Sequence, residues 1–253
     1  MNKKQTYIGI AVVVFVFGIF AIPKIIKRIE MGDVVKNDRL NVSELNTTGG
    51  ENNGGLSYIK IDGKDRKVPH FKLVNQDNDT ITDLDYRGKV FLVEFFFTRC
   101  TSICIPMRKN LLDIQEKFKD NKHFGIASIS IDPNNDTPKV LKQYAEDYGV
   151  TYPDWNFLTG NKDSIYNLAN EKFGLLAQVN PKVQGSFIHS GLFALVDQNG
   201  FIRSRRDEFG NPKIYYRGFV PKNADLGPDD ETSEVGILVE DIKKLLNKNK
   251  GDE

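Results

Sequence analysis

The stretch that decides the fold is Val90 to Cys104, VFLVEFFFTRCTSIC, in which the most apolar run of the folded part ends at the chain's two cysteines. Val90 to Phe97 is dominated by β-branched and aromatic residues, a pattern typical of a strand that is covered on both faces in a parallel sheet. After Cys104, apolar residues from Met107 to Phe118 recur at three- and four-residue spacing, which predicts a helix. The stretch therefore predicts a strand, a short loop and a helix, with both thiols at the junction.

Cys100 and Cys104 are four residues apart. If a helix begins near Cys100, positions i and i+4 share one face, so both thiols point the same way. The Cα separation of a disulfide, about 4.4 to 6.8 Å, is compatible with this spacing, and a helix N-terminus favours thiolate, which predicts a low thiol pKa. The spacing leaves three uses open: a reversible disulfide, soft-metal binding, or attack on a substrate sulfur or peroxide.

Strand and helix patterns alternate along the rest of the chain. We expect an extended segment and a hairpin at 68–83, strands at 124–131, 187–196 and 201–206, and helices at 138–149, 163–173 and 235–246. Thr137 is placed to cap the helix that begins at Pro138. This order predicts a three-layer α/β domain with a mixed sheet. Residues 207–234, rich in proline and glycine, are interpreted as an irregular surface loop.

The composition argues against several classes of function. The chain has 253 residues, 40% of them hydrophobic, with 35 Lys and Arg against 34 Asp and Glu. That is enough for one substantial core, and the formal charge of +1 gives no reason to expect a nucleic-acid partner. No small-molecule substrate is expected either. Two cysteines are too few for a disulfide-stapled mini-protein or a four-thiolate zinc site.

The N-terminal region has the pattern of a membrane anchor. The apolar run Tyr7 to Ile22 follows Lys3 and Lys4, and no small-residue cleavage motif follows Phe20, which favours an uncleaved transmembrane helix over a signal peptide. Residues 29–57 are polar and rich in Asn and Gly, as in a flexible tether. We therefore expect an anchor at 1–28, a tether at 29–57 and a folded domain at 58–250, held outside the cytoplasm on the periplasmic side of the inner membrane.

A third ligand would decide between a metal site and a disulfide, and the chain has three histidines. His123 lies in a polar turn, where an exposed side chain is expected. His70 follows Pro69 near the first strand of the domain, where packing or exposure is again the better interpretation. His189 lies in an apolar segment near Gly191, which permits close backbone approach. Taken alone, His189 is more typical of a satisfied core histidine than of a metal ligand.

Four segments together resemble one known family: Phe95–Pro106 (FFFTRCTSICIP), Ser130–Pro138 (SIDPNNDTP), Trp155–Gly160 (WNFLTG) and His189–Gly200 (HSGLFALVDQNG). They are similar to the Sco/SenC proteins, membrane-anchored, thioredoxin-like copper proteins implicated in assembling the copper centre of cytochrome c oxidase. The likeness runs from about Val68 to Leu246 in the family's order. One departure is that the family commonly has a proline after each cysteine, where this chain has Thr101 and Ile105.

The resemblance implies a thioredoxin-like fold after one transmembrane helix, and one copper ion, Cu(I) or Cu(II), held by Cys100, Cys104 and His189. Thiolates suit Cu(I), and imidazole accepts both oxidation states. It also implies a metallochaperone that delivers copper to a copper-accepting subunit of cytochrome oxidase. Residues 132 and 136 match acidic positions of the family, although turn formation and helix capping explain Asp132 and Asp136 equally well.

Other functions remain open on the sequence. A thiol-disulfide reductase acting on a partner's cysteines would use Cys100 and Cys104 as catalytic residues and would not need His189. A peroxide-reducing protein would use Cys100 as nucleophile and Cys104 to resolve it. A structural disulfide in a binding module is the simplest alternative, so enzymatic activity stays undecided. Arg99, beside the first cysteine, is expected to favour its thiolate.

Overall fold

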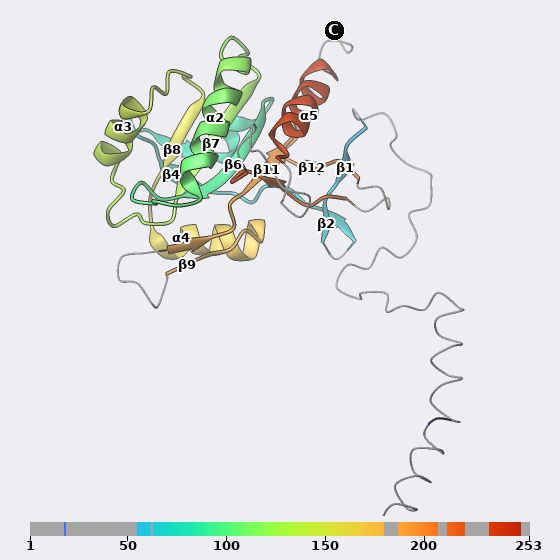
Figure 1. Cartoon of the computed structure of the whole chain (residues 1–253), viewed down its shortest axis with the longest axis horizontal. Coiled ribbons are helices and arrows are strands. Elements are labelled where there is room, and N and C mark those ends of the chain that lie inside the picture. Colours follow the sequence, from blue (N-terminus) through green and yellow to red (C-terminus); the bar gives the residue numbers. More distant parts are fainter. Residues whose placement is uncertain are drawn as a thin grey trace, which may run out of the picture. The chain divides into compact units, whose positions relative to one another are not determined.

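The apolar run before the cysteines forms strand β6 (Val90–Phe96), in the interior of the main sheet. Every residue of β6 and of its parallel neighbour β7 (Phe124–Ser130) is buried. A strand buries both faces only when other layers cover them, which explains why its sequence shows no alternation of polar and apolar residues. The prediction of a doubly covered parallel strand is confirmed (Figure 1).

The main sheet is mixed, as predicted. Its strand order is β1-β12-β11-β6-β7-β8, with β13 paired to β11. β6, β7 and β8 run parallel, whereas β11 is antiparallel to β6, and β12 is antiparallel to both β11 and β1. The further strands of this sheet are β1 (Ser57–Tyr58), β8 (Trp155–Leu158), β11 (Leu192–Val196), β12 (Ile202–Ser204) and β13 (Tyr216–Arg217). Two small hairpins precede β6, formed by β2 (Lys60–Ile61) with β3 (Lys64–Asp65) and by β4 (Lys72–Val74) with β5 (Thr80–Thr82).

Two of the helices begin where the sequence supplies a capping side chain. Thr137 has an extended backbone and its side chain accepts a hydrogen bond from the Val140 N–H, so α3 starts at Pro138. Asn161 caps the next helix in the same way. The helical elements are η1 (Asp83–Tyr86), α2 (Cys104–Phe118), α3 (Pro138–Asp147), α4 (Lys162–Asn167), a π-helical turn η2 (Leu168–Phe173) and α5 (Val235–Lys248).

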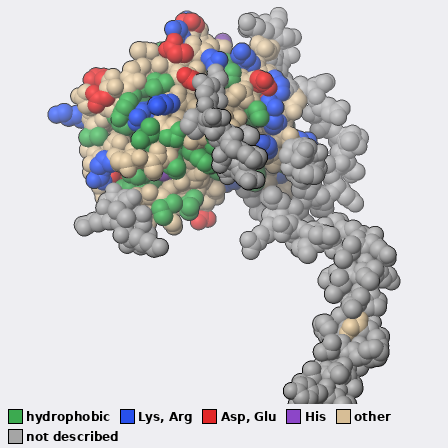
Figure 2. Space-filling model, in the orientation of Figure 1, with side chains coloured by type: hydrophobic (Ala, Val, Ile, Leu, Met, Phe, Trp, Pro, Cys, Tyr) green, Lys and Arg blue, Asp and Glu red, His purple; other side chains and the backbone are tan. Residues whose placement is uncertain are grey.

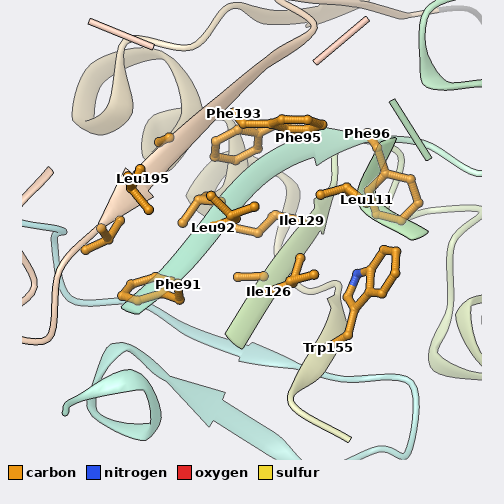
Figure 3. Packing of buried hydrophobic residues seen from close by; sticks show 14 of the residues in the cluster. Phe91, Leu92, Phe95, Phe96, Leu111, Ile126, Ile129, Trp155, Phe193 and Leu195 are labelled. Carbon is orange, nitrogen blue, oxygen red and sulfur yellow. The ribbon is translucent and has the colours of Figure 1, made fainter. Parts of the chain in front are cut away.

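Aromatic side chains fill the core between sheet and helices. Figure 3 shows Phe91, Phe95 and Phe96 of β6 beside apolar residues of β7 and β11, and Trp155 of β8 facing the same cluster. The Trp155 indole is 1% exposed, and its Nε1 donates to the Ser128 hydroxyl at 2.9 Å, so its one polar atom is satisfied. Burying each such side chain contributes about 1.5 to 3 kcal/mol to the stability of the fold. Strand β6 is therefore firmly held and fixes the start of the loop that follows it.

The predicted strand at 187–196 is wrong as one element. The chain forms β10 (Phe187–His189), which pairs with β9 (Ala177–Val179) outside the main sheet, and then β11 within it. Gly191 joins the two strands with φ +67°, and a Cβ at this position would lie 2.8 Å from a Phe219 ring carbon. Only glycine tolerates both conditions without strain. Because both strands are apolar, the turn between them is hidden in a hydrophobicity pattern.

The expectation that both cysteines lie on one helical turn is also wrong. Helix α2 begins at Cys104, and Cys100 lies in the preceding loop, where its N–H donates to the Phe97 carbonyl at 3.2 Å. The loop places Cys100 independently of the i, i+4 rule. The two sulfurs are close because the loop turns back, and not because they share a helix face.

Part of the segment interpreted as a surface loop packs into the core. Tyr216 is 1% exposed and its hydroxyl donates to Asp241 of α5 at 2.9 Å. The Asn110 amide of α2 donates to the carbonyls of Gly218 and Val220 at 2.8 and 2.9 Å. The surface-loop interpretation is therefore wrong for Tyr216, Gly218 and Val220, whereas Ile214 is exposed. Residues 207–211 and 221–232 lie outside the described residues.

The computed structural model describes residues 18, 55–61, 63–179, 187–206, 212–220 and 233–248. Within these ranges no helix has the length and apolar character needed to cross a membrane. Apart from residue 18, the predicted anchor at 1–28 lies outside them, as does most of the predicted tether. Figure 2 shows acidic and basic side chains interspersed on the face it displays, in keeping with the near-zero formal charge.

Candidate metal centre

Three separate segments bring Cys100, Cys104 and His189 together. They come from the loop after β6, the first residue of α2 and the last residue of β10. Their ligand atoms all lie within 4.8 Å of one another, and the residues are 8%, 3% and 6% exposed. In the described part of the chain no fourth His, Cys, Asp or Glu joins this group. The fold therefore gathers two sulfurs and one imidazole just beneath the surface.

His189 is held against Cys104 by its strand. Its Nε2 lies 2.9 Å from the Cys104 sulfur, and its ring meets the Phe97 ring edge-on at 6.0 Å between centroids. Its Nδ1 is buried and has no hydrogen-bond partner among the described residues. The interpretation of His189 as a satisfied core histidine is therefore wrong, because one ring nitrogen is orphaned. Most metal-binding histidines have a partner that fixes the second nitrogen, and here packing and strand pairing orient the ring instead.

The two thiols differ in protonation. A hydrogen bond from Cys104 lowers the pKa of Cys100 to about 3, against the opposing effect of burial, with further help from His189 and from the backbone N–H groups of residues 102 and 104. The same contact with Cys100, together with burial, holds the pKa of Cys104 well above its usual range. The low thiol pKa predicted from the sequence therefore applies to Cys100 and not to Cys104.

Two aspartates fix the loop that carries Cys100. The Asp136 carboxylate is fully buried and accepts hydrogen bonds from the Thr98 N–H at 3.0 Å and the Thr98 hydroxyl at 2.6 Å. Asp132 accepts from the Arg99 guanidinium at 2.5 Å. The sequence left open whether these aspartates form turns and caps or support the site, and the structure shows that they tie the β7–α3 connection to the cysteine loop.

Arg99 does not have the role expected from the sequence. Its guanidinium is exposed and paired with Asp132, whereas the lowered pKa of Cys100 comes from hydrogen bonds to the sulfur. Thus Arg99 stabilises the loop that holds the thiolate. The other two histidines stay away from the site: His70 is exposed and lies 3.0 Å from Asp83, and His123 is exposed, as predicted.

A buried carboxyl lies behind the thiols. Glu94 points from β6 into the interior, is 5% exposed, and accepts a hydrogen bond from Ser128 at 2.6 Å. Burial raises the pKa of Glu94 to about 7. Sequence reasoning missed this residue, although a signal was present: Glu94 is the one charged residue in the run VFLVEFFF.

The donor set fits a soft metal ion. Two cysteine sulfurs and an imidazole suit Cu(I), whereas Mg²⁺ and Ca²⁺ require oxygen ligands. A structural zinc site would normally supply four protein ligands. Cysteine sulfurs bind metal ions as thiolates, and the lowered pKa of Cys100 favours that form at its sulfur. The site can hold one soft ion with an open coordination position, or it can close into a disulfide, since both cysteines are free.

Comparisons with known proteins agree with this geometry. A family model described as SCO1/SenC matches residues 60–218. The SCO1 protein homolog of Bacillus subtilis is 37% identical over 136 residues, which are 53% of this chain and 70% of that protein. A Stutzerimonas stutzeri protein whose name includes the words "copper-binding protein" is 27% identical over 144 residues, 55% of this chain and 69% of that protein.

Among solved structures, one titled as a disulfide switch in BsSco, a member of the Sco family of cytochrome c oxidase assembly proteins, superposes with a TM-score of 0.56 at 29% identity. The superposition covers 72% of this chain and 94% of that one. The mixed α/β architecture is the thioredoxin-like fold of these proteins. The family match over residues 60–218 and the Bacillus subtilis relative show that this chain belongs to the SCO1/SenC family.

Proposed function

We propose that this chain is a copper metallochaperone that binds one copper ion through Cys100, Cys104 and His189. The observation that carries the proposal is the convergence of these three donors within 4.8 Å from three segments of the chain. Sulfur and imidazole are the ligands that Cu(I) prefers. The relative from Stutzerimonas stutzeri, named for copper binding, supports copper as the ion.

The proposed acceptor is a copper-binding subunit of cytochrome c oxidase. The solved Sco structure is titled as a member of a family of cytochrome c oxidase assembly proteins, which supports this partner. The position of the site suits transfer by ligand exchange. Cys100 lies in a loop beside exposed Thr101 and Ser102, and at 8% it is the most exposed of the three proposed ligands, ahead of His189 at 6% and Cys104 at 3%.

Copper competition titration tests the three-ligand site. The reduced chain is titrated with Cu(I) against a chromogenic chelator, and His189→Ala is compared with the exposed-histidine control His123→Ala. We expect one Cu(I) per chain for the parent and the control. Loss of an outer-shell partner costs about 10- to 100-fold in metal affinity, so the loss of a ligand in His189→Ala is expected to cost at least as much. Unchanged affinity and stoichiometry in His189→Ala would defeat the three-ligand site.

A thiol-disulfide reductase is a second candidate, and the asymmetric thiol pair favours it. A thiolate at Cys100 can attack a partner's disulfide, and the Cys104 thiol can then resolve the mixed disulfide. The BsSco structure, which is described as containing a disulfide switch, also supports this candidate. This activity does not require His189. Retained reduction of a partner by His189→Ala, together with lost oxidase assembly, would show that metal transfer is the physiological task.

We further propose the domain organisation 1–28 anchor, 29–57 tether and 58–250 copper-binding domain, with the domain on the periplasmic side of the inner membrane. The apolar run at 7–22 and the Asn- and Gly-rich stretch after it support this arrangement. Membrane fractions would be extracted with alkaline carbonate and then treated with protease from the periplasmic side. Release by carbonate, or a domain protected from periplasmic protease, would contradict the proposal.

A further inference from the structure

The β9–β10 strand pair carries His189 outside the main sheet, so few backbone contacts fix its position. His189 lies opposite Ala177 in this pair, and its Nδ1 atom has no hydrogen-bond partner among the described residues. A metal-binding histidine is usually oriented by a hydrogen bond to its second ring nitrogen. Whatever holds the backbone of β9 and β10 therefore also decides where the His189 ring lies.

The side-chain amide of Asn170 holds β9 from the side opposite to β10. Its Nδ2 donates to the Ala177 carbonyl at 2.8 Å, and its Oδ1 accepts from the Ala177 N–H at 2.8 Å. These are the two bonds that a neighbouring antiparallel strand would make to one residue, so the amide takes the place of a third strand. Ala177 is 1% exposed, and leaving its backbone groups unpaired there would cost free energy.

The two bonds from Asn170 also show which kind of pair His189 makes. Because the N–H and C=O of Ala177 point towards Asn170, they point away from β10, so Ala177 and His189 form a non-hydrogen-bonded pair. The Ser190 N–H donates to the Leu176 carbonyl at 3.1 Å, as expected for the adjoining pair. Side chains of directly opposite residues share one face, so a shift of one residue in this register would turn the imidazole away from the cysteines.

A π-helical turn brings Asn170 within reach of β9. The turn η2 continues directly from α4, and the N–H of Gly174 reaches back to the carbonyl of Ala169, in the i→i+5 pattern of a π-helix. Gly174 has φ +68°, so the chain reverses there, and Ala177 returns beside Asn170 (Figure 1). Such turns are rare and are frequently found at functional sites. Here the turn places the amide beside the strand that pairs with β10.

The end of η2 is itself fixed to the rest of the domain. The Arg66 guanidinium and the Tyr215 hydroxyl donate to the carbonyls of its last two residues. The backbone carbonyl of Arg66 accepts from the N–H of Ile202, in strand β12 of the main sheet, at 2.9 Å. A continuous series of contacts therefore runs from the main sheet through η2 and Asn170 to β9 and His189.

We propose that Asn170 is a positioning residue of the copper site: by holding β9, it sets the depth and orientation at which the His189 imidazole meets Cys104. This role rests on the proposed three-ligand copper site. It requires no contact between Asn170 and the ion, because both polar atoms of the amide are used by Ala177. If Asn170 only stabilised the fold, its loss would lower stability and leave the ligand set of the site unchanged.

The first measurement uses the reduced, metal-free full chain. Deuterium exchange of backbone amides is followed by mass spectrometry in peptides that contain Ala177 and Ser190. The variant Asn170→Ala removes both hydrogen bonds, whereas Asn170→Asp keeps the size of the side chain and removes only the bond to the carbonyl. The control is Asn167→Ala, at an exposed asparagine that ends α4.

Both peptides should exchange faster when the amide of Asn170 is lost. Two hydrogen bonds of ordinary net strength correspond to about 30-fold in an opening equilibrium, so we expect exchange in Asn170→Ala to be about 30-fold faster than in the parent. The increase in Asn170→Asp is expected to be smaller, because one bond remains. Asn167→Ala is expected to exchange at the rate of the parent.

The second measurement is Cu(I) affinity by competition titration in the parent and in the His189→Ala background. Loss of an outer-shell partner costs about 10- to 100-fold in metal affinity, and we expect Asn170→Ala to cost about 10-fold in the parent. In the His189→Ala background the same change is expected to cost less than about twofold, because the ligand through which Asn170 acts is already gone. X-ray absorption of Cu(I)-loaded Asn170→Ala should show a weakened imidazole signal beside unchanged sulfur scattering.

Three results would overturn the proposal. They are unchanged exchange of both peptides in Asn170→Ala, a Cu(I) affinity within about threefold of the Asn167→Ala control, and an equal loss of affinity in both backgrounds. If Asn170→Ala does not fold, exchange and affinity of Asn170→Asp equal to those of the parent would overturn it as well. Failure of the three-ligand site is recognised separately, since His189→Ala alone would then bind Cu(I) as the parent does.

Discussion

Replacing Asp136 should loosen the loop that carries Cys100 while leaving the three proposed ligands in the sequence. The Asp136 carboxylate is fully buried and accepts from the Thr98 N–H and hydroxyl, from the Ser130 hydroxyl at 2.5 Å and from the Asn135 amide at 2.7 Å. Hydrogen bonds to a charged group contribute about 1.5 to 3 kcal/mol each, and a donor left unpaired in the interior costs about 1 to 3 kcal/mol.

Asp136→Asn replaces one accepting oxygen by an amide that can only donate. We expect it to lower the free energy of unfolding by about 2 to 3 kcal/mol, and Asp136→Ala, which removes both oxygens, by about 4 kcal/mol, short of the sum because hydrogen bonds in one network are not additive. The exposed control Asp113→Asn should stay within about 0.5 kcal/mol of the parent.

Urea denaturation of the reduced chain measures these differences, and the rate of alkylation of Cys100 reports on the loop in the same variants. The destabilised loop is expected to move Cys100 away from the Cys104 thiol. Because the hydrogen bond from Cys104 lowers the pKa of Cys100, the thiolate fraction of Cys100 at low pH should then fall. A cost below about 1 kcal/mol for Asp136→Asn, with alkylation unchanged, would refute the view that this carboxylate holds the cysteine loop.

Three further predictions follow from burial and backbone geometry. The pKa of Glu94 rises on folding from about 4.5 to about 7, so its contribution to stability is complete below pH 4.5 and is lost as the pH rises through 7. Urea unfolding at low and high pH should show the parent losing about 3 kcal/mol relative to Glu94→Gln, and parallel pH profiles would contradict this. Gly191→Ala adds a methyl group both at positive φ and against a neighbouring ring, so calorimetry should show about 2 to 3 kcal/mol of destabilisation. The control Gly200→Ala adds a methyl group at positive φ in open space and should cost only about 1 kcal/mol. Equal costs for the two variants would refute the contribution of the clash with the ring. The alkylation rate of Cys100 should be independent of pH between about 5 and 8 because its thiolate is already formed, and should become pH-dependent in Cys104→Ala, which removes the hydrogen bond responsible.

The sequence predicted the elements with strong local signals. The doubly covered strand β6, the Thr137 cap of α3 and the amphipathic helix α5 all follow from patterns within about ten residues. The mixed sheet followed from the order of these elements. The break at Gly191 was missed because apolar residues continue on both sides of it, and hydrophobicity does not record the sign of φ.

The candidate site was predictable only in part. The residue spacing identified Cys100 and Cys104 as a pair, but nothing local to His189 distinguishes it from a core histidine, and its candidacy came from the resemblance to a family. The structure adds the contact that sequence could not show, 2.9 Å between Cys104 Sγ and His189 Nε2 across 85 residues of chain. Glu94 was missed and the role of Asp136 was left open, because the importance of both residues depends on which residues face them after folding.

The central claim is that one Cu(I) binds to two sulfurs and one imidazole nitrogen. X-ray absorption spectroscopy of the reduced chain, loaded with one equivalent of Cu(I), measures this ligand set directly. We predict scattering from two sulfur ligands and one histidine nitrogen in the parent chain, and loss of the imidazole signal in His189→Ala. A parent spectrum with sulfur ligands only, identical to that of His189→Ala, would contradict the account.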